Sequence, residues 1–163
     1  MEHGEYMIDL LNEEGIVVGQ KKRKDINREK DILHSVYIVL FTTKKECLLS
    51  IVPTATIYGG MLGVTSATFV RQGETSLEAA TRSLRNDFGF TEVPLTFLGE
   101  KMHTFTGNIR RLSGIYYGFI SALNNKDLKR FTRDSLVKEI TKGGDFAPSF
   151  KTIYLEYEDK WPF

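Results

Sequence analysis

Residues 68–90, TFVRQGETSLEAATRSLRNDFGF, predict a loop that leads into one amphipathic helix, and the rest of the chain is arranged around it. Thr75 and Glu78 have the spacing of a capping box, in which two side chains bond to free N–H groups at a helix start. Apolar residues then recur at helical spacing: Leu77, Ala80, Leu84 and Phe88. Gly89 suits a left-handed C-cap, with Phe90 placed to close over the last turn.

A polar group is expected on another face of this helix. Ser83, Asn86 and Asp87 stand at i, i+3 and i+4, so their side chains should cluster. Only Asp87 among them carries a carboxylate. We expect any chemistry of the chain to involve this group.

The same stretch resembles the box motif of the Nudix hydrolase superfamily, whose members are MutT-like. In that motif a Gly is followed, after five residues, by a Glu and, after seven more, by Arg-Glu. An aliphatic residue, any residue, Glu-Glu, any residue, Gly and a hydrophobic residue complete it. Five positions of this chain fall in register: Glu74, Arg82, Leu84, Gly89 and Phe90.

The chain departs from the motif at the opening Gly and at the three metal-binding Glu positions. Thr68 replaces the Gly, and because Thr is β-branched and poorly tolerates positive φ, the loop path is expected to differ. Ser83, Asn86 and Asp87 replace the three Glu residues, which in the family hold Mg²⁺ or Mn²⁺ against a substrate diphosphate.

The resemblance also implies roles for the residues that match. Glu74 and Arg82 would form a structural ion pair behind the metal site, and with Asp87 they are the candidate catalytic residues. Asp87 is the candidate metal ligand. Ser83 and Asn86 are candidate substrate-binding residues.

The changed positions predict weak metal binding. Mg²⁺ prefers hard oxygen ligands, commonly carboxylates together with substrate phosphates and waters. Ser83 and Asn86 offer neutral oxygens only, so the ligand charge from these positions falls from three to one. The sequence leaves open which acid outside the box, if any, would compensate: the candidates are Glu92, Glu100 and Glu139, and for each a surface charge is the alternative.

Arg71 is a further candidate substrate-binding residue. It stands in the loop before Gly73-Glu74, where an acidic residue is common in the family. Guanidinium groups suit phosphate oxygens, so Arg71 would supply a cation where metal charge is missing. A solvated side chain is the alternative.

Composition indicates an ordinary soluble globular chain, expected to form a single domain over residues 1–163, with 41% hydrophobic and 26% charged residues. A net charge of +1 gives no general attraction to nucleic acid or to an anionic membrane. The single cysteine, Cys47, is expected to be a buried hydrophobe, which suits a reducing cytoplasm. No apolar run is long enough to span a bilayer.

Patterning along the chain predicts a hairpin at about residues 5–20, followed by a basic connector at 21–34. Strands are expected at residues 35–43, 47–52, 95–105 and 110–122, a loop at 53–63 and a polar break at 124–129. A helix should start at Asp134 and a C-terminal helix should cover about 148–159. This order predicts an α+β fold, a Nudix-like α/β/α sandwich with a mixed central sheet.

The likeness extends over roughly residues 6–160 and is strongest to the Nudix branch that is similar to isopentenyl diphosphate isomerase. Leu33-His34 before the first long strand and DFAPSFKTIYLEYEDK at residues 145–160 carry it. The isomerase chemistry is not implied, because that enzyme uses a catalytic Cys and Glu, and Cys47 lies in an unrelated strand.

Two functions follow as hypotheses. The first is hydrolysis of a nucleoside diphosphate-linked or other small diphosphate substrate, a pyrophosphatase activity weakened or lost with the carboxylates. The second is a non-catalytic nucleotide-binding or regulatory module. Nucleic-acid binding by residues 21–28 is a weaker third idea, because acidic residues interrupt the basic run. Homodimer formation is left open.

Overall fold

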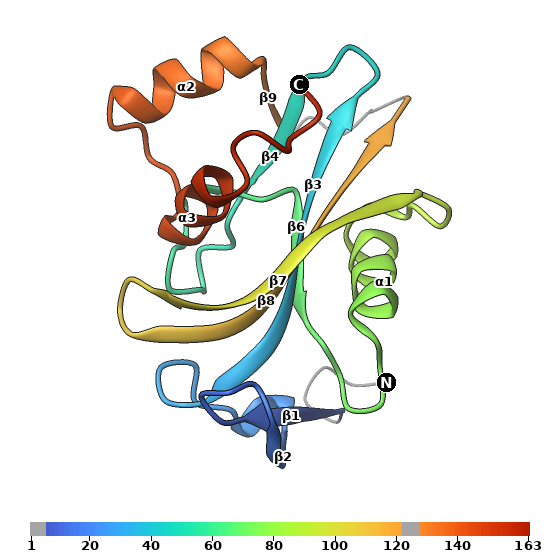
Figure 1. Ribbon diagram of the computed structural model, residues 1–163, viewed down its shortest axis with the longest axis vertical. Coiled ribbons are helices and arrows are strands. Elements are labelled where there is room, and N and C mark those ends of the chain that lie inside the picture. Colours follow the sequence, from blue (N-terminus) through green and yellow to red (C-terminus); the bar gives the residue numbers. More distant parts are fainter. Residues whose placement is uncertain (1–5, 122–127) are drawn as a thin grey trace. The chain divides into compact units, whose positions relative to one another are not determined.

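The computed structural model describes residues 6–121 and 128–163 (Figure 1). Its elements follow in the order β1 (Met7–Leu11), β2 (Val17–Lys22), the 3-10 turn η1 (Arg23–Asp25), β3 (Ile32–Thr42), β4 (Cys47–Ile51), β5 (Leu62–Gly63), β6 (Ser66–Phe69), α1 (Ser76–Phe88), β7 (Leu95–Phe105), β8 (Ile109–Ile120), β9 (Lys129–Phe131), α2 (Arg133–Thr141) and α3 (Pro148–Glu156).

Within the described residues, the strands are hydrogen-bonded into a mixed sheet of nine strands. One path of neighbours runs β2-β1-β3-β4-β5. In addition, β6 and β8 pair with β3, β7 pairs with β8, and β9 pairs with β4. With its helices this is the α+β fold that the sequence predicts.

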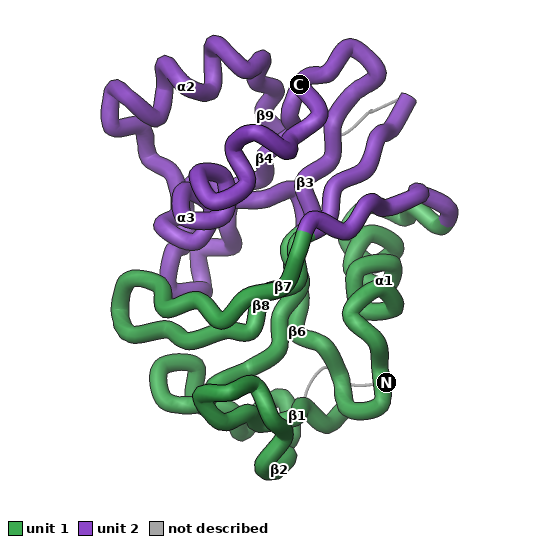
Figure 2. The backbone as a smooth tube through the Cα atoms, viewed as in Figure 1, with its two compact units in different colours: residues 1–37, 67–91, 99–115 green, residues 38–66, 92–98, 116–163 purple. Residues whose placement is uncertain are grey.

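The chain separates into two compact units (Figure 2). Unit 1 comprises residues 1–37, 67–91 and 99–115, and unit 2 comprises residues 38–66, 92–98 and 116–163. The complete box stretch, residues 68–90, therefore belongs to unit 1. The assignment of one domain to residues 1–163 stays a prediction.

Unit 1 begins with the predicted hairpin, in which β1 and β2 are antiparallel. Ile8 on β1 and Leu33 on β3 are fully buried, which anchors the hairpin in the core of this unit. The turn between β7 and β8 holds Gly107 at φ 89° and Asn108 at φ 61°. Two left-handed residues in sequence match the right-handed twist of a tight hairpin, and Gly and Asn tolerate that conformation best.

Unit 2 has an aromatic core. The ring of Phe41 contacts those of Trp161 and Phe163, with centroids 6.3 and 5.1 Å away. Phe150, Ile153 and Tyr154 on α3 are buried, so the apolar stripe of the last helix packs into the core. Cys47 is buried as expected, and burial raises the pKa of its thiol.

The structure also corrects local expectations. The polar break predicted at 124–129 ends in strand β9, because Lys129–Phe131 pairs with β4, a partner distant in sequence. Residues 122–127 lie outside the described part. Two residues expected to be buried on helices are exposed, since the helices present other faces to the core: Leu77 (50% exposed) and Val137 (42%).

None of the described helices combines the length and the apolar character needed to cross a bilayer.

Candidate functional site

Helix α1 starts and ends as its sequence predicts. The Thr75 hydroxyl accepts a hydrogen bond from the Glu78 N–H at 3.1 Å, and the Glu78 carboxylate accepts one from the Thr75 N–H at 2.9 Å. Gly89 follows at φ 75°. The rings of Phe88 and Phe90 stack with centroids 5.5 Å apart. Both helix ends are therefore fixed by local interactions.

Glu74 and Arg82 form a bidentate ion pair that ties the loop to the helix. Arg82 Nε donates to Glu74 Oε2 and Arg82 Nη2 donates to Glu74 Oε1, each at 2.9 Å. Arg82 Nη2 also donates to the Phe69 carbonyl at 2.9 Å, and the Arg71 N–H donates to Glu74 Oε1 at 3.0 Å. Arg82 is only 8% exposed. This is the structural pair that the Nudix resemblance implies.

The environment of Glu74 lowers its pKa below the ordinary value of 4.5. Partial burial acts in the opposite direction, but it is outweighed by the hydrogen bonds from Arg82 and the Arg71 N–H and by the two positive charges. A lowered pKa in the folded state means that the ionised carboxylate stabilises the fold. That contribution is present above the unfolded-state pKa and is lost as the pH falls through the folded-state pKa.

The pH dependence of stability should therefore report on Glu74. We expect the difference in unfolding free energy between the wild type and Glu74→Gln to be constant from pH 7 to about 5, and to shrink below pH 4.5, the ordinary pKa of this carboxyl group. Urea denaturation of both proteins between pH 7 and pH 3 measures it. A difference that stays constant to pH 3 would contradict the role given to the carboxylate.

Thr68, at the position of the motif's opening Gly, lies inside strand β6. Thr68 is not among the residues with positive φ, and the left-handed position of this loop is Gly73, at φ 79°. Arg82 Nη1 lies 3.4 Å from the Thr68 hydroxyl, so this side chain faces α1. A β-branched residue is thus accommodated here without backbone strain.

The predicted polar group does not share one exposed face of α1. Ser83 is buried, at 3% exposure, whereas Asn86 and Asp87 are exposed. The reason is helical spacing: Ser83 lies one turn after Ala79 and Ala80, both fully buried. Asn86 and Asp87 stand a turn further along, where the helix is exposed. Their candidate catalytic and substrate-binding roles stay predictions.

The donors present do not fit a divalent-ion site of the Nudix type. In residues 6–121 and 128–163 no group of three or more His, Cys, Asp or Glu side chains is placed to hold a metal ion. Glu100 lies in the same unit as the box, but its Oε1 is 2.7 Å from His34 Nε2. Glu92 and Glu139 belong to unit 2. Of the three box positions, Asp87 alone carries a carboxylate.

Arg71 packs against the N-terminal strand region. Its guanidinium carbon lies 3.8 Å from the centroid of the Tyr6 ring, and it forms a backbone bridge with Ile8. Its Nε is buried and has no hydrogen-bond partner among the described residues. Arg71 is thus held in place by stacking, with part of its hydrogen-bonding capacity unused.

Three further arginines, which sequence reasoning did not single out, surround one aromatic ring. We call Arg23, Arg28 and Arg111 around Phe69 the arginine cluster; the guanidinium carbons lie 5.1, 5.6 and 5.4 Å from the ring centroid. The available signal was the basic segment at 21–34 together with Arg110-Arg111, but the spacing of these segments gives no hint that they meet.

Comparison with known proteins defines the fold. The sequence matches no protein-family model and none of the curated proteins. Among solved structures, it is similar to DR0079 from Deinococcus radiodurans, with a TM-score of 0.71 and 21% identity over 86% of this chain and 92% of that chain. It is also similar to a MutT protein from Methanosarcina mazei Go1, with a TM-score of 0.62 and 18% identity over 79% and 94% of the two chains.

A third similar structure is the NUDIX domain of Shewanella oneidensis NrtR complexed with ADP ribose. The TM-score is 0.61, with 14% identity over 84% of this chain and 94% of that chain. At these identities the likeness establishes architecture. The chain has the Nudix fold.

Proposed function

We propose that this chain belongs to the Nudix family and binds a small diphosphate-containing compound, of the nucleoside diphosphate type, without efficient hydrolysis. The observation that carries the proposal is a contrast within the box stretch, residues 68–90. The bidentate pair of Glu74 with Arg82 is complete, whereas the box positions for metal ligands offer one carboxylate, Asp87. The scaffold is retained and the donors for a divalent ion are not.

Charge supports binding without turnover. A Mg²⁺ ion gives up its hydration shell reluctantly and is commonly held by carboxylates together with substrate phosphates and waters. Ser83 is neutral and buried, and Asn86 is neutral. The NUDIX domain of NrtR was solved with ADP ribose, so a protein of this fold accommodates a ligand of the proposed class. A cytoplasmic location, where such compounds are abundant, is part of the proposal.

Hydrolysis is the second candidate function. The specific observation that favours it is the geometry of the Glu74–Arg82 pair, which holds the box helix in the arrangement that the resemblance implies for active members. Asp87, Glu74 and Arg82 would be the catalytic residues, with Mg²⁺ or Mn²⁺ as the cofactor.

Calorimetry and product analysis on the same samples separate the two. We expect ADP or ADP-ribose to bind equally well with chelator and with added Mg²⁺ or Mn²⁺, and no product to form. Metal-dependent turnover that Asp87→Ala abolishes would establish the hydrolase instead. Arg85→Ala is the matched control, because Arg85 is an exposed residue on the same helix.

A further inference from the structure

The side chains of strand β6 project alternately to two opposite faces of the sheet in unit 1. Thr68 faces α1, as its contact with Arg82 shows, and Val70 is buried. Side chains alternate along a strand, so Phe69 projects to the opposite face. The arginine cluster around Phe69 therefore lies on the face of β6 that is turned away from the box helix.

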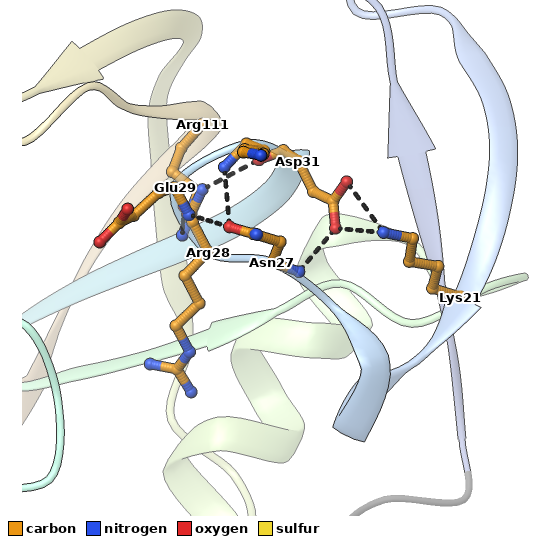
Figure 3. Close-up of polar contacts among 7 residues, drawn as sticks. Lys21, Asn27, Arg28, Glu29, Asp31 and Arg111 are labelled. Atoms are coloured by element: carbon orange, nitrogen blue, oxygen red, sulfur yellow. Dashed lines mark hydrogen bonds and ion pairs between the residues drawn. The ribbon is translucent and has the colours of Figure 1, made fainter.

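Arg111 holds one side of the cluster in place. It is buried, and its guanidinium donates to the carbonyls of Arg110 at 2.8 Å, Arg28 at 3.3 Å and Asp31 at 3.5 Å. These bonds join β8 to the loop between η1 and β3 (Figure 3). Arg111 therefore fixes the backbone from which Arg28 projects.

This loop contains two acids, Glu29 and Asp31, and Asp31 is paired with groups other than the arginine cluster. Asp31 Oδ2 lies 3.0 Å from Lys21 Nζ and accepts a hydrogen bond from the Asn27 N–H at 2.7 Å. Figure 3 shows Arg28 reaching away from these contacts. In the described part of the chain, neither Arg23 nor Arg28 has a carboxylate partner, and their guanidinium groups donate no hydrogen bond.

Two positive charges that have no carboxylate partner among the described residues are thus held next to each other. Burial, and after it the charge of Arg23, lowers the pKa of the Arg28 guanidinium. Such an arrangement costs stability, and unfavourable charge placement of this kind concentrates at functional sites. An anion between the two guanidinium groups would remove the repulsion.

The hydrogen-bonding geometry favours phosphate. A guanidinium presents its N–H groups as a planar fork that matches two phosphate oxygens, and two forks match a diphosphate. The guanidinium carbons of Arg23 and Arg28 lie over the Phe69 ring, and within the described residues the N–H groups of both side chains have no acceptor. Tyr6 interacts with Arg28 and stacks on Arg71, so a third cation borders the cluster, and its Nε has no hydrogen-bond partner in the described part of the chain.

We propose that Arg23 and Arg28, with Arg71 at the border, bind the diphosphate group of the ligand on the face of β6 opposite to α1. This inference rests on the proposed function and gives it a location. In active Nudix members a bound metal ion supplies positive charge to the diphosphate. Here Asp87 is the one acid among the three changed positions of the box helix, and the arginines supply the positive charge instead.

Titration of inorganic pyrophosphate in the presence of chelator tests the proposal. We expect the wild type to bind, and Arg23→Gln with Arg28→Gln to weaken binding at least tenfold. Lys24→Gln with Lys30→Gln is the matched control, because both lysines are exposed in the same segment and the charge change is equal. Arg23→Lys with Arg28→Lys keeps the charge and should retain part of the affinity, and it substitutes if the Gln variant fails to fold.

The outcomes separate this inference from the proposed function. If ADP binds to the wild type and to the double Gln variant equally well, the site is elsewhere and the inference is wrong, while the proposed function stands. If neither ADP nor pyrophosphate binds to the wild type, both are wrong. If a single-stranded RNA oligonucleotide binds more tightly than pyrophosphate at the same salt concentration, and the double Gln variant abolishes it, the cluster is a nucleic-acid site and the inference is overturned.

Discussion

Replacement of Arg82 with Ala should lower the free energy of unfolding by about 3–5 kcal/mol, because it leaves the carboxylate of Glu74 without its partner in a largely buried position. The same change removes the donor to the Phe69 carbonyl. Both of the lost interactions connect the loop to α1. Chemical denaturation with circular dichroism measures the change.

Two comparisons make this result interpretable. Arg85→Ala, on an exposed part of the same helix, should change stability by less than about 0.5 kcal/mol. Glu74→Gln should cost less than Arg82→Ala, because a neutral amide can still accept hydrogen bonds. An Arg82→Ala protein as stable as the wild type would show that the bidentate pair does not hold the loop.

The second large effect is expected at Leu84. This residue on α1 is 2% exposed, and Leu84→Ala should cost about 2–5 kcal/mol through lost burial and the cavity that remains. Leu77→Ala on the same helix should cost less than about 1 kcal/mol, because Leu77 is 50% exposed. The midpoints of urea unfolding for the two variants give the comparison.

This pair also tests which face of α1 is buried. Spacing alone places Leu77 and Leu84 on one apolar stripe, whereas in the structure only Leu84 is in the core. Equal costs for the two substitutions would favour the stripe over the observed packing.

Local features of the fold could be predicted from the sequence. The caps of α1 depend on residues within a few positions of each other, so Thr75, Glu78 and Gly89 were sufficient to define its ends. The long strands β3 and β7 were recognisable from their β-branched and aromatic residues. Strand β9 was missed because it exists only through pairing with β4.

The candidate site likewise has features that could be predicted from the sequence and features that could not. The ion pair of Glu74 with Arg82 spans eight positions and belongs to a known motif, so the resemblance implied it. The arginine cluster joins Arg28 to Arg111 across 83 positions, and no periodic pattern connects them. Burial of Ser83 likewise depends on how far the helix packs into the core, which spacing does not define.

The single acid among the three box positions and the arginines around Phe69 are explained together by the proposed function. A protein can bind a diphosphate through a metal ion or through guanidinium groups, since both supply positive charge to phosphate oxygens. Here the three box positions retain one acid, and the opposite face of β6 carries two arginines without carboxylate partners among the described residues.

Titration of Mn²⁺ into the free protein, followed by calorimetry, measures whether the box helix holds a divalent ion. We expect no binding below millimolar concentrations, and we expect Asp87→Asn to give the same titration as the wild type. Micromolar binding of Mn²⁺ by the wild type, weakened at least tenfold by Asp87→Asn, would contradict this expectation.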